Sequence, residues 1–340
     1  MRELVLASLM SIPLYLATVR VQGLLSQLCL LMVLVGFPAG IIRAAEGGRV
    51  HHLPLSGTAV LAPQFSPSPG VDVTLTYAHT DGVMPEYQTV SVAGLLVDGL
   101  KLEENHFALS VFWQPDWETA QQWSYTMGLT LPFVSVNAAS TVNHDGHTGQ
   151  ERYHMDSARG LGDIVLFPMV LQYALDRHWH GAVNLAVYAP TGDFQVGRLA
   201  NPGLNYWTFE PAVSLSYLEP AQGQAFSIKS GIGINTENPD TDYHSGAQFY
   251  LESSLSQYVM FFGGFTGLGV TGYWSEQLTG DSGRGAVLGD FNTRRLAVGP
   301  VLSYKAGWAD VEFSLSWLHE INSQHQLKGD TLSFQVQGRY

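Results

Sequence analysis

The chain of 340 residues has little charge and a single cysteine. Asp, Glu, Lys and Arg make up 13% of it, about half of their share in soluble globular proteins. Because a soluble protein needs charged side chains to cover its surface, this composition indicates a surface hidden in lipid or an uncharged polar lumen. Cys29 lies in the apolar N-terminal segment, so the rest of the chain offers no disulfide and no thiol chemistry.

Charge is nearly absent from residues 4–42, and small residues at the end of this segment precede an abrupt polar shift. The pattern predicts a secretory signal peptide over residues 1–45, cleaved after Ala44 or Ala45. Because the segment is longer than a usual signal, a true start near residue 19 is one interpretation, and a retained membrane helix at 21–42 is another. Residues 46–70 are expected to form a periplasmic lead.

The chain is acidic once the predicted signal peptide is removed. Losing Arg2, Arg20, Arg43 and Glu3 leaves 13 basic and 28 acidic side chains, a balance of −15. A charge of this sign disfavours nucleic acid and anionic lipid surfaces as partners.

A period of two residues recurs from about residue 71 to the end of the chain. In "NYWTFEPAVSLSYL" (205–218) one set of positions is apolar and the other polar. The apolar set is Trp207, Phe209, Val213, Leu215 and Tyr217, and the polar set includes Thr208, Glu210, Ser214 and Ser216. Similar alternation over 71–79, 123–133, 308–320 and 332–340 predicts β-strands with two chemically different faces.

Strand length and aromatic placement favour a membrane barrel over a soluble sheet. The alternating segments run about 10–15 residues, which suits a tilted bilayer crossing, whereas strands of soluble sheets usually have about 5–6. Aromatic residues stand at segment ends, where an interfacial girdle would place them: Trp123, Trp207, Trp274, Trp308 and Tyr340. An aromatic last residue also resembles the signal read by the bacterial outer-membrane assembly machinery. We therefore predict an all-β fold, an antiparallel transmembrane β-barrel of the bacterial outer-membrane type over 71–340, monomeric and surrounded by outer-membrane lipid.

Loop lengths predict how many strands the barrel has. Short and long connections alternate, as expected for periplasmic turns and outer loops. This order predicts twelve strands, near 71–80, 103–114, 123–138, 161–176, 179–190, 205–218, 224–236, 246–258, 260–275, 292–305, 308–321 and 330–340. Residues 86–102 are interpreted as part of the first outer loop or as a short piece in the barrel mouth, and 139–160 as an outer loop. The alternative is fourteen strands, in which 56–65 forms an additional strand, but the prolines of this region disfavour it.

With the apolar face in lipid, the polar face of each strand lines the interior. The charged residues on that face are Asp72, Glu210, Lys229, Glu252, Arg295, Glu312, Glu320 and Arg339. Charges there are costly unless they are paired or hydrated. They are interpreted either as a salt-bridged plug or as a polar track that selects a solute.

Metal and catalytic motifs are weak. Glu237, Asp240 and Asp242 form an oxygen-rich loop, but their spacing fits no EF-hand. The loop histidines are scattered: His51, His52, His144, His147 and His154. Adjacent His244 and Ser245 would point to opposite faces of a strand, and no nucleophile elbow, P-loop or dinucleotide motif occurs. We expect no metal, no cofactor and no enzymatic activity.

Four separated segments resemble a known family. They are "GLGDIVLFPMVLQY" (160–173), "APTGDFQVGRLANPGLNYWTFEPAVSLSYL" (189–218), "GIGINTENPDTDYHSG" (231–246) and "GYWSEQLTGDSGRGAVLGDFNTRRLAVGPVLSY" (272–304). Together they resemble the outer-membrane transporter family associated with the meta-pathway of phenol degradation, well over 160–340 and loosely over 71–159. The resemblance implies an outer-membrane location and uptake of aromatic or other hydrophobic compounds, and it supplies no catalytic residues.

The leading hypothesis is thus a passive channel for a small hydrophobic or aromatic solute. A closed barrel with a structural or binding role is the second, and an outer-membrane lipid hydrolase is the third.

Overall fold

A computed structural model describes residues 68–84, 88–117, 122–143, 151–289, 293–324 and 326–340. The chain divides into Met1–Ile41, which lies outside the described residues, and Ile42–Tyr340. The strands are β1 (Gly70–Val83), β2 (Thr89–Val92), β3 (Leu95–Gln114), β4 (Trp123–Asn143), β5 (Glu151–Leu161), β6 (Ile164–Ala174), β7 (Trp179–Ala189), β8 (Thr208–Glu219), β9 (Gln224–Asn235), β10 (Gln248–Phe261), β11 (Gly264–Gln277), β12 (Arg294–Ala306), β13 (Val311–Gln324) and β14 (Lys328–Arg339). The predicted signal peptide and most of the predicted lead precede the described residues.

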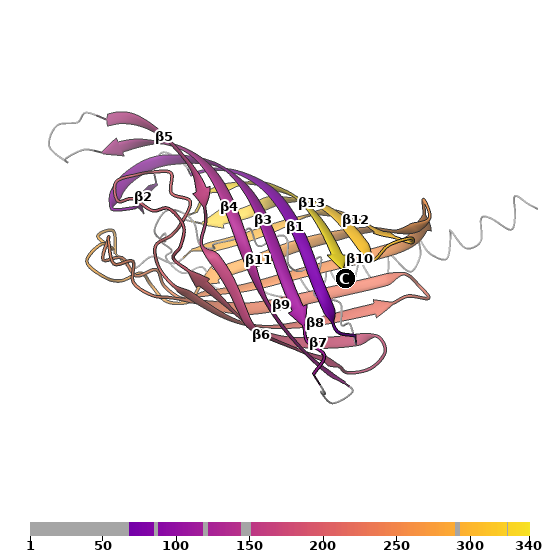
Figure 1. Ribbon diagram of the computed structural model, residues 1–340. Helices are drawn as coiled ribbons and strands as arrows, with labels where there is room; N and C mark the ends of the chain where they lie inside the picture. Colours follow the sequence, from indigo (N-terminus) through magenta and orange to yellow (C-terminus); the bar gives the residue numbers. More distant parts are fainter. Residues whose placement is uncertain (1–67, 85–87, 118–121, 144–150, 290–292, 325) are drawn as a thin grey trace, which may run out of the picture. The chain divides into compact units, whose positions relative to one another are not determined.

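Twelve of these strands close into an antiparallel barrel (Figure 1). Beginning at β1, each strand pairs with the next along the chain, except that β2 and β5 are passed over, and β14 pairs with β1. Val71 and Tyr340 exchange backbone hydrogen bonds of 2.9 Å in both directions, so the first and last strands begin and end at one rim. The predicted twelve-strand barrel is confirmed.

The two faces of the barrel wall follow the alternation of the sequence. In β8, Phe209 and Val213 are 42% and 56% exposed, whereas Glu210 and Ala212 are each 4% exposed. In a single-layer wall the buried side is the interior, so the exposed apolar side faces outward. A closed barrel with an apolar outer face satisfies its backbone hydrogen bonds internally and fits the hydrocarbon of a bilayer. The chain therefore has the architecture of a membrane-spanning β-barrel.

Aromatic side chains lie exposed near both rims. Trp123 and Trp207 are about half exposed, and Trp308 and Tyr340 are largely exposed, while Trp274 packs against Phe249 with ring centroids 5.3 Å apart. This distribution fits the interfacial girdles of outer-membrane barrels. Among the described residues there is no helix long and apolar enough to cross a membrane.

Two predicted outer segments contain strands that sequence reasoning missed. β3 starts at Leu95 rather than near 103, and it pairs with the four-residue β2. The predicted outer loop at 139–160 is wrong in its described parts, because β4 continues to Asn143 and β5 pairs with it over Glu151–Leu161. The first segment is apolar, but its apolar side chains are buried rather than exposed to lipid, and the second segment is mostly polar. Both form strands because a neighbouring strand offers them backbone partners.

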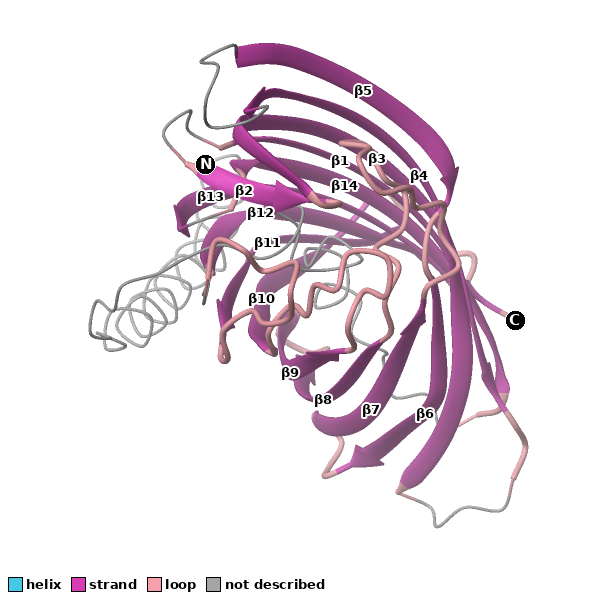
Figure 2. Cartoon of the chain, turned by 90° about the vertical axis from the view of Figure 1, so that its left-hand side faces the viewer, coloured by secondary structure: helices cyan, strands magenta, loops and turns pink. Residues whose placement is uncertain are grey.

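The outer rim is uneven, and loops fold across its lower side (Figure 2). β3 and β4 have 20 and 21 residues, whereas β6 and β7 have 11 each. Carboxylates anchor the loop 190–207 on this side. Asp156 Oδ2 accepts a 3.0 Å hydrogen bond from Leu199 N, and Asp163 accepts from Gly192 N at 2.9 Å and from Leu204 N at 2.8 Å. The loop is therefore tied to β5 and to the link between β5 and β6.

Candidate functional site

Glu210 is the centre of a buried polar group inside the barrel. Its Oε1 accepts a 2.7 Å hydrogen bond from the Tyr250 hydroxyl and its Oε2 accepts one of 3.3 Å from the Tyr188 hydroxyl. The ammonium of Lys229 lies 3.9 Å from Glu210 Oε1 and 5.2 Å from the centre of the Tyr250 ring. These contacts join β7, β8, β9 and β10 through one carboxylate.

A second group forms around Glu320 on β13. Arg295 of β12 pairs with this carboxylate, with a 2.8 Å hydrogen bond from its Nε to Oε1. The Tyr273 hydroxyl donates to the same oxygen at 2.8 Å, and Gly329 N donates to Oε2 at 3.2 Å. Arg295 also lies 5.5 Å from the centre of the Tyr273 ring. These donors satisfy both oxygens of the buried carboxylate.

Glu252 connects the two groups. In the register of β10 it stands opposite Lys229 on β9 and opposite Tyr273 on β11, and only 2% of it is exposed. The result is a continuous band of side chains from β7 to β13, which we call the polar belt. It consists of Tyr188, Glu210, Lys229, Tyr250, Glu252, Tyr273, Arg295 and Glu320.

The remaining predicted interior charges lie nearer the rim that carries the chain ends. Arg339 Nη1 donates to Asp72 Oδ2 at 2.5 Å and Nη2 donates to Gln114 Oε1 at 3.1 Å, which joins β14, β1 and β3. Glu312 accepts a 3.3 Å hydrogen bond from the Tyr258 hydroxyl. These contacts are separate from the polar belt, so the eight predicted residues divide into a central set of five and a set of three near the inner rim.

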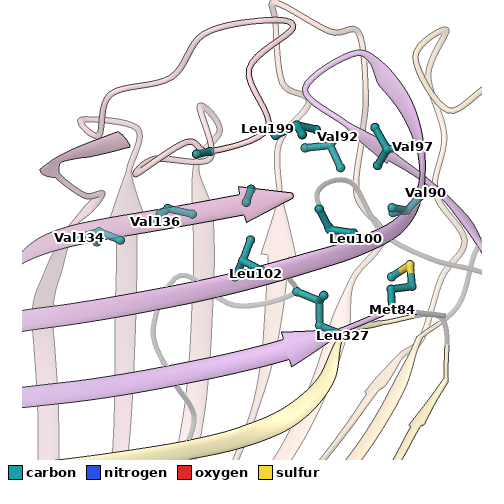
Figure 3. Close-up of a cluster of buried hydrophobic side chains, with 12 residues drawn as sticks. Met84, Val90, Val92, Val97, Leu100, Leu102, Val134, Val136, Leu199 and Leu327 are labelled. Atoms are coloured by element: carbon teal, nitrogen blue, oxygen red, sulfur yellow. The ribbon is translucent and has the colours of Figure 1, made fainter. Parts of the chain in front are cut away.

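An apolar cluster lies on the inner side of β3 and β4 at the outer end (Figure 3). We call it the mouth cluster, and its buried members are Met84, Val90, Val92, Val97, Leu100, Leu102, Val134, Val136, Ala138, Leu199, Ala200 and Leu327. The alternation of the strands did not predict this cluster, because it assigns polar residues to the interior. Going inward, the lumen surface therefore changes from apolar at the mouth to charged at the polar belt.

The outer loops around Asp281 form a small buried network. Its carboxylate accepts hydrogen bonds from the Tyr243 hydroxyl at 2.6 Å, from Gly246 N at 2.9 Å and from Gln277 Nε2 at 2.6 Å. Burial raises the pKa of the Asp281 carboxyl to about 6, and these three donors oppose the rise. The network links the loop 236–247 to the loop 278–293.

The residues considered for metal binding and catalysis are engaged otherwise. Asp240 accepts from Asn205, and Asp242 pairs with Arg284. In the described part of the chain no group of three or more His, Cys, Asp or Glu is arranged to hold a metal ion; Glu237 and His154 are described, whereas His51, His52, His144 and His147 lie outside it.

His244, the other residue weighed for catalysis, contacts Ser282 rather than its neighbour Ser245. Its Nδ1 lies 3.1 Å from Ser282 Oγ, and its Nε2 lies 2.9 Å from the carbonyl oxygen of Asn235.

Comparison with known families agrees with the architecture. Residues 88–336 match the model of the family described as "Putative MetA-pathway of phenol degradation". The chain belongs to this family. The match includes most of the barrel wall and six of the eight predicted interior charges, because Asp72 and Arg339 fall outside it. No curated protein sequence matches the chain.

Three solved structures resemble this member of the phenol-degradation family to different degrees. An outer membrane channel from Pseudomonas putida F1 matches with a TM-score of 0.62 and 13% identity, covering 82% of this chain and 98% of that one. The β domain of the Bordetella autotransporter Brka has a TM-score of 0.47 at 10% identity, covering 80% and 100%. The translocator domain of NalP from Neisseria meningitidis has 0.44 at 10%, covering 83% and 91%. The first of these shows a shared fold.

Sequence reasoning missed the tyrosines of the polar belt. From sequence alone one could place Tyr188, Tyr250 and Tyr273 in the lipid-facing girdle, because Tyr is common there. Their position in the alternation could have shown that they face inward, since Tyr250 and Glu252 stand two residues apart on the same face of β10. In this family member the tyrosines bring the hydroxyl donors that a buried carboxylate requires.

Proposed function

We propose that this chain is a passive outer-membrane channel for small hydrophobic or aromatic compounds. The observation that supports it is the mouth cluster, because apolar side chains on the inner side of the outer rim offer an apolar solute a surface that water does not compete for. Membership of a phenol-degradation family fits the same class of solute. Movement down a gradient requires no cofactor and no catalytic group.

In this proposal the polar belt is the inner section of the path. The buried side chains of the belt range from 1% exposed, for Tyr250, to 7% exposed, for Tyr188. An entering solute must therefore displace side chains rather than water. A carboxylate and hydroxyl surface of this kind would orient a solute that carries one polar group. The chain would act as a monomer, inserted by the outer-membrane assembly machinery.

Flux measurement tests the proposal. The folded protein is placed in proteoliposomes that contain lipopolysaccharide, which limits leakage of aromatic compounds through lipid, and uptake of radiolabelled toluene, phenol and glucose is compared with protein-free vesicles. We expect protein-dependent uptake of toluene and phenol that exceeds uptake of glucose. If no solute enters faster than in protein-free vesicles, the barrel is instead a closed structural or binding protein.

A further inference from the structure

A short hairpin lies over the barrel mouth. We call residues Thr89–Asp98 the mouth hairpin; it is formed by β2 and the first residues of β3, paired from Thr89 with Asp98 to Val92 with Leu95. Its two turn residues, Ala93 and Gly94, have φ values of 47° and 83°, as two-residue hairpin turns require. The hairpin therefore has its own turn and its own ladder, and it can keep its form when it moves.

The inner side of the mouth hairpin is packed on the mouth cluster. Val90, Val92 and Val97 are 0%, 5% and 0% exposed and belong to that cluster. Figure 3 shows them facing Leu199 and Leu100, which come from the loop 190–207 and from β3. Apolar packing of this kind has no directional bonds, so another apolar molecule can take the place of the hairpin on the cluster.

The tip of the hairpin reaches loops that belong to other strands. Gly197 N donates a 2.8 Å hydrogen bond to the carbonyl oxygen of Ala93. A Cβ placed on Gly94 would lie 3.4 Å from Cγ1 of Val196 and 3.9 Å from Cγ2 of Thr241. The hairpin thus extends from β3 to the loops that follow β7 and β9, and Figure 2 shows it across the opening.

The base of the hairpin has a bend. The pairing of β3 with β4 shifts between Asp98 and Lys101, and Gly99 within this shift has φ of 61°. A bulge with a residue in the left-handed region bends a strand and interrupts its ladder. The bend directs the hairpin over the mouth and is the position about which it would turn.

We propose that the mouth hairpin is a lid that an apolar solute opens by replacing it on the mouth cluster. A ligand shifts an equilibrium only when it binds one state better. When the lid leaves, an apolar solute can bind favourably to the exposed mouth cluster, whereas a sugar cannot. Opening of the lid and selection of the solute therefore depend on the same surface. This inference rests on the proposed channel function.

A disulfide tests the lid directly. A Cβ on Gly94 would lie 3.4 Å from Cγ1 of Val196, a position that the Sγ of a cysteine at 196 can occupy. The pair to cross-link is therefore Gly94→Cys with Val196→Cys, with Cys29→Ser as the background. We expect toluene flux to fall by about tenfold or more on oxidation and to recover with dithiothreitol, since the open population is removed. Each single cysteine variant is the control and should keep its flux under oxidation.

A second pair of variants does not depend on the strained Gly94 position. Val90→Asp with Val92→Asp places carboxylates in the apolar cluster and should expel the lid, because buried unpaired charge is costly. We expect ion conductance and glucose flux to rise by about tenfold. Val287→Asp, at an exposed apolar residue of the loop 278–293, is the control and should leave both unchanged.

The outcomes separate the lid from the channel. If native protein carries toluene and neither the disulfide nor the carboxylates alter any flux, the lid is overturned and the channel remains. If the folded native protein and the carboxylate variant both carry nothing, the channel itself fails and the lid with it. A shifted band on unboiled gels shows that each variant has folded.

Discussion

Glu210 illustrates how a carboxylate is stable inside a barrel wall. It is 4% exposed, and a lone buried charge would be strongly unfavourable. Two tyrosine hydroxyls and the ammonium of Lys229 surround it, so donors replace water. The carboxylate therefore holds four strands together and also occupies space in the proposed path.

Replacing Glu210 with Ala should change both stability and flux. The tyrosines and Lys229 lose their common acceptor, so we expect a loss of about 3 kcal/mol in unfolding free energy, as when one partner of a buried pair is removed. The vacated space should raise phenol flux severalfold. Thermal unfolding and vesicle uptake measure the two effects, and Glu237→Ala, at an exposed position in the loop that follows β9, is the control. Lower stability with unchanged flux would identify Glu210 as part of a plug.

Asp281 should make the outer loops sensitive to pH. Burial raises its pKa to about 6 in the folded state, whereas an unfolded Asp titrates at about 3.9. A raised carboxyl pKa means that the fold favours the protonated form, so the loops are most stable below pH 4 and lose stability as the pH rises to about 6. Amide exchange of Gly246, corrected for intrinsic rates, should show decreasing protection over this window. Asp281→Asn should abolish the change, and an unchanged profile in that variant would contradict the assignment.

At the scale of elements, glycines in the wall provide room for the interior tyrosines. A Cβ on Gly231 of β9 would lie 2.6 Å from the hydroxyl oxygen of Tyr250 and 2.7 Å from its ring. At Gly233, two residues along the same strand, the nearest atom would be 3.7 Å away. The position of Tyr250, and with it the hydrogen bond to Glu210, depends on the absence of a side chain at Gly231.

Gly231→Val should displace Tyr250 and destabilise the barrel by about 1–3 kcal/mol, as overpacking does. Gly233→Ala should be tolerated, since its added methyl group has ordinary contact distances. Thermal unfolding of both variants in detergent measures the difference. Equal stability of the two variants would show that the Tyr250 side chain can adopt another conformation without cost.

The same scale shows where element prediction failed. β8 was predictable because lipid on one side and the interior on the other impose a strict alternation on Phe209, Glu210 and Val213. Residues 139–143 of β4 and all of β5 extend beyond that constraint, so lipid imposes no alternation on their sequences. The two segments pair because their backbone groups lie side by side in the fold, and this proximity cannot be predicted from the local sequence.

At the scale of the whole molecule, closure depends on the seam between the first and last strands. β1 and β14 share twelve paired positions from Asp72 with Arg339 to Val83 with Lys328. Arg339 adds side-chain bonds to Asp72 and Gln114 at the inner end. A barrel has no free edge only when this seam is closed.

Arg339→Ala should weaken the closed barrel by about 3 kcal/mol, because Asp72 is left partly buried without its cation. Lys305→Ala removes an exposed pair with Asp310 and should cost less than about 1 kcal/mol. Urea unfolding, followed by the loss of the shifted band on unboiled gels, compares them. An equal effect of the two variants would contradict a special role for the seam.

The sequence by itself determined the class of fold, the number of wall strands and the face to which Glu210 and its fellow charges belong. It did so because lipid outside the wall and polar groups inside it act on each residue separately, at a period of two. Only the tertiary structure decided that Tyr188, Tyr250 and Tyr273 complete a polar belt, and that β2 and the loop 190–207 meet over an apolar mouth. Those contacts join residues from strands far apart in sequence, and their energy comes from packing and shared hydrogen bonds that no local pattern records.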